Sequence, residues 1–184
     1  MKLRFNEAKA AQTAARFLKL RGGRMSYLKL IKLLYFVDRE GLLRWGRPVT
    51  TDQYVSMDKG PVVSKIYDLI TEEPRPDGPT VWYSLISTPQ DFEVSLLQDP
   101  PPSDELSVAE EQLIDEMFAR FGAKSRWDLV EFAHTLPEWK NPEGSAIPLQ
   151  YADILRAEKR PQEEIDEILR ELEELGVVQA LTSR

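Results

Sequence analysis

The chain has 184 residues, no cysteine and a single histidine, a length that fits one domain with at most a small subdomain. The missing cysteines exclude disulfides, thiolate nucleophiles and thiolate-bound metal clusters, and the single histidine excludes sites that need two imidazoles. The net charge of −7 is unevenly spread: residues 1–70 carry 14 Lys and Arg against 6 Asp and Glu, and residues 71–184 carry 10 against 25. We expect the two parts either to fold against each other or to face different partners.

Two helices are predicted in the first 45 residues. The first follows Asn6, a good N-cap, and ends near residue 20, just before two glycines. The second follows Ser26 and continues to about Arg44. Its first eleven residues are apolar except for two lysines, a pattern typical of a helix buried at the centre of a domain.

Short strands are predicted in the middle of the chain. Residues 51–57 form one β-like run, and Pro61 suits the first position of a following helix. The prolines and glycine of residues 74–79 predict a loop. Residues 80–87 and 92–97 read as the two strands of a hairpin, so we expect a small antiparallel sheet.

The remainder of the chain favours helices. Residues 99–103 contain three consecutive prolines and form the best candidate linker. Helices are predicted near residues 108–121, 126–135, 148–158 and 162–175, the first two with capping-box patterns. The expected fold is mainly α with a small antiparallel β-sheet (α+β), a compact helical domain around a buried central helix. Its expected parts are the domain itself, 1–160, and an acidic C-terminal helix, 161–184, packed on it or extending from it.

Sequence motifs for catalysis are scarce. The phosphate-binding patterns GxxxxGK[ST] and GxGxxG and the nucleophile-elbow pattern GxSxG do not occur. His134 ends a predicted helix, where we expect it to cap or pack rather than to act as a base or ligand. The carboxylates of residues 108–121 and 162–175 lie opposite apolar stripes, as solvated faces do, although a hydrolase or a Mg²⁺ site would use the same groups. We expect no enzyme activity, no cofactor and no metal.

A DNA-binding regulator is an alternative, since the first two predicted helices resemble a helix-turn-helix in outline. Residues 27–31 would have to face the groove, yet they are mostly apolar and look buried, and Arg21 and Arg24 would contact only phosphates. Nucleic acid is therefore not the expected partner. The chain shows no apolar run of about 20 residues and no secretory signal, and we expect no membrane association and a cytoplasmic location.

Four short motifs follow one another between residues 28 and 69: KLLYFVD, GRPVT, YVSMDKGPV and IYDL. In this order they resemble the Panacea antitoxin domain family, which includes the phage-related SocA antitoxin. The resemblance is clear over residues 8–70 and weaker to about residue 160. It implies an antitoxin that neutralises, by direct binding, a toxin encoded by a neighbouring gene. It also implies a link to delivery of the toxin to a protease. Some relatives carry an added DNA-binding domain; because the family-like region begins at residue 8, autoregulation by this chain is not expected.

An inhibitor that acts by occlusion needs a rigid scaffold and a contact surface. Aromatic and Arg side chains supply most of the binding energy at protein interfaces, and Met side chains adapt to differently shaped partners. The candidate partner-binding residues are therefore Trp45, Arg47, Tyr54, Met57 and Lys59. Alternatively, the tryptophan and tyrosine belong to the core, and Asp38 pairs with the arginine.

The acidic C-terminal helix is a further candidate contact, because it could attract a basic, nucleic-acid-acting toxin. Its glutamates are Glu163, Glu164, Glu167, Glu171 and Glu174.

Overall fold

The computed structural model describes residues 3–72 and 80–182, so the loop predicted at residues 74–79 lies outside the described residues. Within the described part, helices dominate and the strands are short. The elements are α1 (Glu7–Arg21), β1 (Arg24–Ser26), α2 (Tyr27–Trp45), β2 (Tyr54–Met57), β3 (Gly60–Val63), α3 (Ser64–Thr71), α4 (Val81–Leu85), β4 (Glu93–Ser95), α5 (Val108–Phe121), α6 (Arg126–His134), β5 (Ile147–Leu149), α7 (Tyr151–Ala157) and α8 (Gln162–Thr182).

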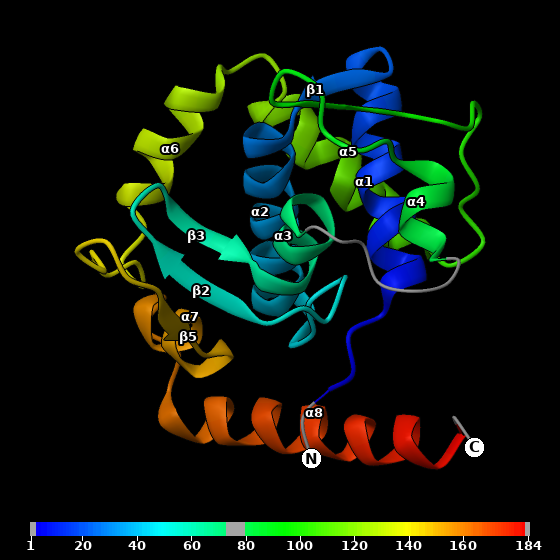
Figure 1. Cartoon of the computed structure of the whole chain (residues 1–184). Helices are drawn as coiled ribbons and strands as arrows, with labels where there is room; N and C mark the ends of the chain where they lie inside the picture. The colour runs from blue at the N-terminus through cyan, green and yellow to red at the C-terminus, as the bar shows by residue number, and fades with distance from the viewer. Residues whose placement is uncertain (1–2, 73–79, 183–184) are drawn as a thin grey trace.

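Helix α2 occupies the centre, as predicted (Figure 1). It contacts α1, α5 and α6 as well as β1 and β3, and nearly all of its first three turns are buried. Four fully buried alanines let α1 lie close to its neighbours α2, α4 and α5. Asn6 caps α1 by accepting a hydrogen bond from the Lys9 amide at 3.0 Å. The predicted fold class, mainly α with small antiparallel sheets, is confirmed.

The strands form two separate antiparallel sheets in the described residues. In the larger sheet β2 lies between β3 and β5, and Tyr54 pairs with Val63 on one side and Leu149 on the other. The smaller sheet joins β1 to β4, with Met25 opposite Val94. Strands β1, β4 and β5 pair with segments 67 or more residues away in the chain. This explains why the local pattern did not predict β1 or β5.

The hairpin predicted at residues 80–87 and 92–97 is wrong in its first half, which is the helix α4. Its amino end is held by a distant group, because the Trp82 amide donates to the Glu7 carboxylate at 3.0 Å. Trp82 itself is fully buried. What remains of the hairpin is an isolated bridge between Ile86 and Leu96 and another between Gln90 and Glu93.

The beginning of α3 is also set by a residue outside the helix, 12 residues earlier in the chain. Pro61 lies in β3 rather than at the first position of a helix, so that prediction is wrong. The helix begins at Ser64, and the Asp52 carboxylate accepts hydrogen bonds from the amides of Lys65 and Ile66 at 2.9 and 3.0 Å. A buried carboxylate thus satisfies amides that the helix leaves without partners.

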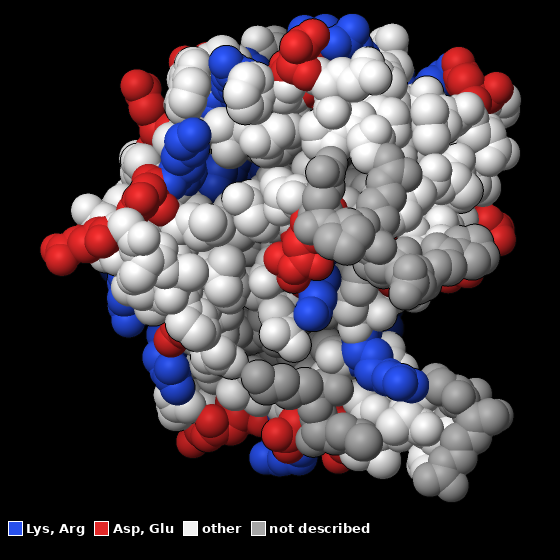
Figure 2. All heavy atoms as spheres, in the orientation of Figure 1, with Lys and Arg blue, Asp and Glu red and all other residues white. Residues whose placement is uncertain are grey.

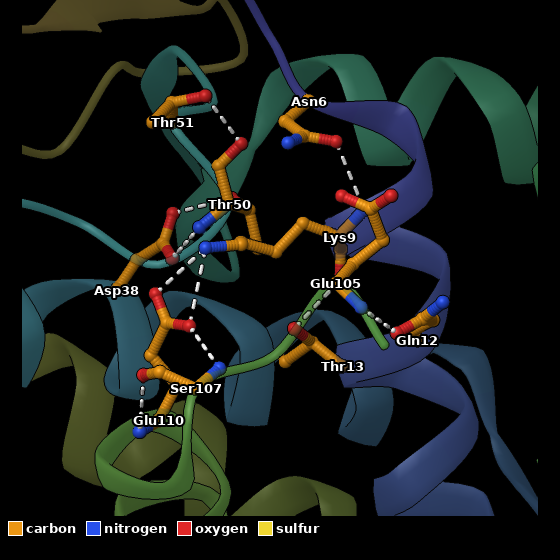
Figure 3. Close-up of polar contacts among 10 residues, drawn as sticks. All are labelled: Asn6, Lys9, Gln12, Thr13, Asp38, Thr50, Thr51, Glu105, Ser107 and Glu110. Atoms are coloured by element: carbon orange, nitrogen blue, oxygen red, sulfur yellow. Dashed lines mark hydrogen bonds and ion pairs between the residues drawn. The ribbon is translucent and has the colours of Figure 1, made fainter. Parts of the chain in front are cut away.

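The basic and acidic parts of the chain fold against each other. Lys9 of α1 reaches the Glu110 carboxylate of α5 at 2.9 Å (Figure 3). Arg16 of α1 pairs with Asp115 at 2.7 Å and also with Glu111. Glu110 is buried, which corrects the expectation that the acidic face of this helix is solvated. Cross-pairing therefore neutralises part of the charge imbalance seen in the sequence.

Candidate partner-binding surface

The five residues predicted to bind a partner lie at three different places. Trp45 ends α2 and is 42% exposed, and Arg47 follows it and is exposed. This end of α2 lies near α8, because a Cβ at Gly46 would stand 3.3 Å from the Ile168 side chain. Met57 ends β2 and Lys59 lies in the turn between β2 and β3, which is beside α6 (Figure 1).

Tyr54 is a core residue, as the alternative interpretation held. It is 2% exposed, and its hydroxyl donates to the Asp38 carboxylate at 3.0 Å. Asp38 also accepts hydrogen bonds from the Thr50 amide and hydroxyl, at 2.7 and 2.5 Å (Figure 3). The predicted pair of Asp38 with Arg47 is therefore wrong, because the polar groups that hold this carboxylate come from Thr50 and Tyr54. Burial raises the pKa of Asp38 to about 7.

The β2–β3 turn is held by the last residue of α6 and by the segment after it. The Trp139 indole donates to the Met57 carbonyl at 3.0 Å, and His134 Nε2 lies 2.8 Å from the Asp58 carbonyl. His134 also stacks on Trp139, with ring centroids 4.1 Å apart, so it packs as expected. The Gly144 amide donates to the Asp58 carboxylate at 2.9 Å. Hydrogen bonds from three different residues thus fix one short turn.

A buried lysine contacts the same hairpin from the interior of the protein. Lys32 has no exposed surface, and its ammonium group donates to the Pro61 carbonyl at 2.8 Å. Burial, followed by the nearby charge of Lys59, lowers the pKa of Lys32 to about 7. Gly60 allows the close approach, because it has a φ of +93° and an added Cβ would lie 2.8 Å from the Ala133 Cβ. The turn and α6 therefore fit together tightly.

An exposed tryptophan lies on this rigid support. Trp127 of α6 is 50% exposed, with Lys59 Nζ 5.5 Å from its ring centroid and the Arg126 guanidinium carbon 5.2 Å away. Both distances fall within the range of cation–π attraction. We call Met57, Lys59, Arg126 and Trp127 the hairpin surface.

The sequence interpretation found two members of the hairpin surface and missed the other two. Arg126 and Trp127 follow Ser125, whose side chain caps α6 in the predicted capping box. The available signal was a large aromatic residue in the polar first turn of a helix, where packing does not require one. Their proximity to Lys59, more than 60 residues earlier, depends on the tertiary structure.

A groove lies between α8 and the larger sheet. This groove has a volume of about 610 Å³ and is bordered by apolar side chains of the sheet and of α8 and by polar groups of α7. Val55 and Leu149 line it from the sheet, and Leu169 and Leu172 line it from α8. The groove therefore lies beside the middle of α8.

The start of α2 is covered, which argues against its use as a recognition helix for DNA. The Tyr27 amide donates to the Phe92 carbonyl at 3.0 Å, and the two rings are 6.3 Å apart. Arg24 pairs with Glu93 of β4 at 2.6 Å. A β-strand thus occupies the position where a helix-turn-helix would have its turn.

Residues 3–72 and 80–182 contain neither a cluster of metal-ligating side chains nor a helix that could span a membrane. No group of three or more His, Asp or Glu side chains there is arranged to hold a metal ion. No helix in that part combines the length and apolarity needed to cross a membrane.

Comparison with known families gives one match. A family model described as "Antitoxin SocA-like, Panacea domain" matches residues 30–140. The match includes most of α2, the whole larger sheet except β5, and α3 to α6, and therefore the entire hairpin surface. Comparisons with curated proteins and with solved structures found no match.

Proposed function

Because the chain belongs to the SocA-like, Panacea-domain family of antitoxins, we propose that it neutralises a cognate protein toxin, encoded by a neighbouring gene, by binding directly to it. The observation that carries this proposal is the hairpin surface. Its half-exposed Trp127 lies on α6 with two cations close to its ring, and hydrogen bonds from the end of α6 and from Trp139 fix the adjacent β2–β3 turn. It lies inside the region that matches the family.

The physical reasoning concerns the cost of binding. Trp and Arg side chains account for much of the energy at protein interfaces, especially near the centre of a well-packed patch. Ordering flexible groups opposes association, whereas a preformed surface avoids that cost. Trp139, His134 and Gly144 already hold the β2–β3 turn in the free protein. Binding through this surface would therefore lose little conformational entropy.

Four of the five residues predicted from the sequence remain in the proposal as contacts. Met57 and Lys59 contribute to the hairpin surface, and Trp45 and Arg47 form a second exposed pair at the end of α2. Tyr54 is removed from the contact set, because it is buried and bonded to Asp38. It supports the start of β2 from inside.

Co-expression with the product of the adjacent gene tests the function. We expect the two proteins to purify together and growth to be restored when the adjacent product alone is toxic. A harmless neighbour that forms no complex would refute the proposal. Measuring the toxin's half-life with and without this protein would reveal whether delivery to a protease contributes.

Substitution of Trp127 tests the surface separately. Truncation of a central interface tryptophan typically costs about 2 kcal/mol or more, so Trp127→Ala should weaken the complex by about 30-fold. Phe92→Ala is the matched control, because Phe92 is also an exposed aromatic residue but lies beside β4. Equal affinities for both variants and the wild type would remove the hairpin surface from the proposal and leave the function standing.

A further inference from the structure

Helix α8 changes character along its length. Its 21 residues include seven Asp and Glu and one Arg, and all of these charges precede residue 175. The last two turns carry apolar side chains that are exposed: Leu175, Val177, Val178 and Leu181, the last at 66%. Exposed apolar side chains gathered in one place often mark a surface that another molecule covers.

One line of residues along α8 follows the spacing of a coiled-coil seam. Successive members are three and four residues apart, which places them on one face of the helix. We call this line the α8 stripe; its members are Glu164, Glu167, Glu171, Glu174, Val178 and Leu181. It is acidic over its first four positions and apolar over its last two.

The α8 stripe lies beside the face that packs on the body of the protein. Ile165 and Leu172 are buried and Ile168 is half-buried, and these three have the same spacing one residue further along. Glu167, Glu171, Glu174, Val178 and Leu181 are all exposed, while Glu164 pairs with Arg160 at 2.7 Å. The helix therefore has two seams, one used in the fold and one facing solvent.

Both halves of α8 are fixed to the rest of the chain. Arg160, just before the helix, donates to the Leu43 carbonyl at 2.6 Å, and the Arg4 amide donates to the Gln179 side chain at 3.1 Å. Figure 1 shows α8 lying across one end of the molecule, with the N-terminal segment reaching it near its middle. In Figure 2 acidic side chains gather along this lower edge. The α8 stripe therefore lies on a helix whose position is fixed before any partner binds.

We propose that the α8 stripe binds a helical segment of the toxin that is apolar at one end and rich in Lys and Arg at the other. This inference rests on the proposed function and names the chemistry of one contact. Charge complementarity selects this occupant. A second copy of α8 is disfavoured, because parallel pairing would oppose glutamate to glutamate and antiparallel pairing would bury Glu164 and Glu167 against Leu181 and Val178.

The two ends of the stripe should affect different rate constants. Glutamates attract a basic segment over a distance and therefore raise the association rate, most strongly at low salt. Apolar contacts form only in the finished complex, and their loss raises the dissociation rate. If the acidic residues only kept the protein soluble, replacing them would change neither rate constant.

Matched variants of α8 test the acidic end in binding measurements with the purified product of the adjacent gene. The double variant Glu167→Gln/Glu171→Gln should associate about tenfold more slowly at 50 mM salt, with a flatter salt dependence. Its control, Asp166→Asn/Glu173→Gln, removes the same charge from the other side of the same helix, and should stay within twofold of the wild type.

The apolar end is tested with two neighbouring valines. Val178→Ser should dissociate about tenfold faster, whereas Val177→Ser, which lies off the stripe at similar exposure, should change little. Because all the altered side chains are exposed, urea unfolding should show the same stability for every variant.

The outcomes separate the two proposals. If the stripe variants bind like the wild type, the α8 stripe is not a toxin contact, and the proposed antitoxin function still stands. Sedimentation that shows a dimer of this chain, lost in Val178→Ser, would assign the stripe to self-association instead. If the wild type forms no complex at all, the proposed function fails and this inference fails with it.

Discussion

Lys32 provides a test of the structure that depends on pH. Its ammonium group is enclosed beneath the β2–β3 turn, 2.8 Å from the Pro61 carbonyl, and burial lowers its pKa from 10.5 to about 7. In the unfolded chain the same group keeps its ordinary pKa. Between pH 7 and pH 10.5 the unfolded state therefore binds more protons than the folded state, and the free energy of unfolding rises with pH in this window.

The size of the effect follows from the two pKa values. The complete difference corresponds to about 5 kcal/mol, and the part gained between pH 7 and pH 9 is about 2 kcal/mol. Lys32→Met lacks the titrating group, so its free energy of unfolding lacks this contribution. From pH 7 to pH 9 the unfolding free energy of the wild type should therefore rise by about 2 kcal/mol more than that of Lys32→Met.

Urea unfolding of both proteins, followed by tryptophan fluorescence and circular dichroism at half-unit steps from pH 6 to pH 9, measures this difference. Other titrating groups contribute equally to both proteins and cancel in the comparison. A difference in unfolding free energy that stays constant within about 0.5 kcal/mol would mean that Lys32 keeps its ordinary pKa in the folded state. That result would refute the burial of the Lys32 ammonium group beneath the β2–β3 turn.

Three further predictions concern stability measured by urea unfolding. Gly60→Ala should cost about 2 kcal/mol or more, because its Cβ would lie 2.8 Å from Ala133; Gly144→Ala, also at positive φ but with open space around it, should cost less, and equal costs would argue against the tight packing. Glu138→Ala should cost about 3 kcal/mol, because it leaves the buried Tyr35 hydroxyl without its acceptor and leaves Arg39 paired only with the exposed Glu158; a loss under 1 kcal/mol would contradict this network. Arg44→Ala should change stability by less than about 1 kcal/mol, because its pair with Glu116 is exposed, and a larger loss would show that the pair is shielded from solvent.

Local patterns in the sequence determined most of the helices. Asn6, Ser107 and Ser125 cap α1, α5 and α6, and each makes its hydrogen bond to an amide three residues later. An apolar run likewise identified α2 as the central helix. The helix predicted at 162–175 was found but continues to Thr182. Such features depend on neighbours within one or two turns, and that is why sequence alone was sufficient for them.

Contacts between distant segments decided the rest. Glu7 holds the start of α4 in addition to the local cap Thr80, and Asp52, 12 residues earlier in the chain, holds the start of α3. The sequence also identified the family and two members of the hairpin surface, but Trp127 joined them only through packing of α6 on the β2–β3 turn. A surface for recognition consists of side chains brought together from separate elements, and their proximity is a property of the folded chain.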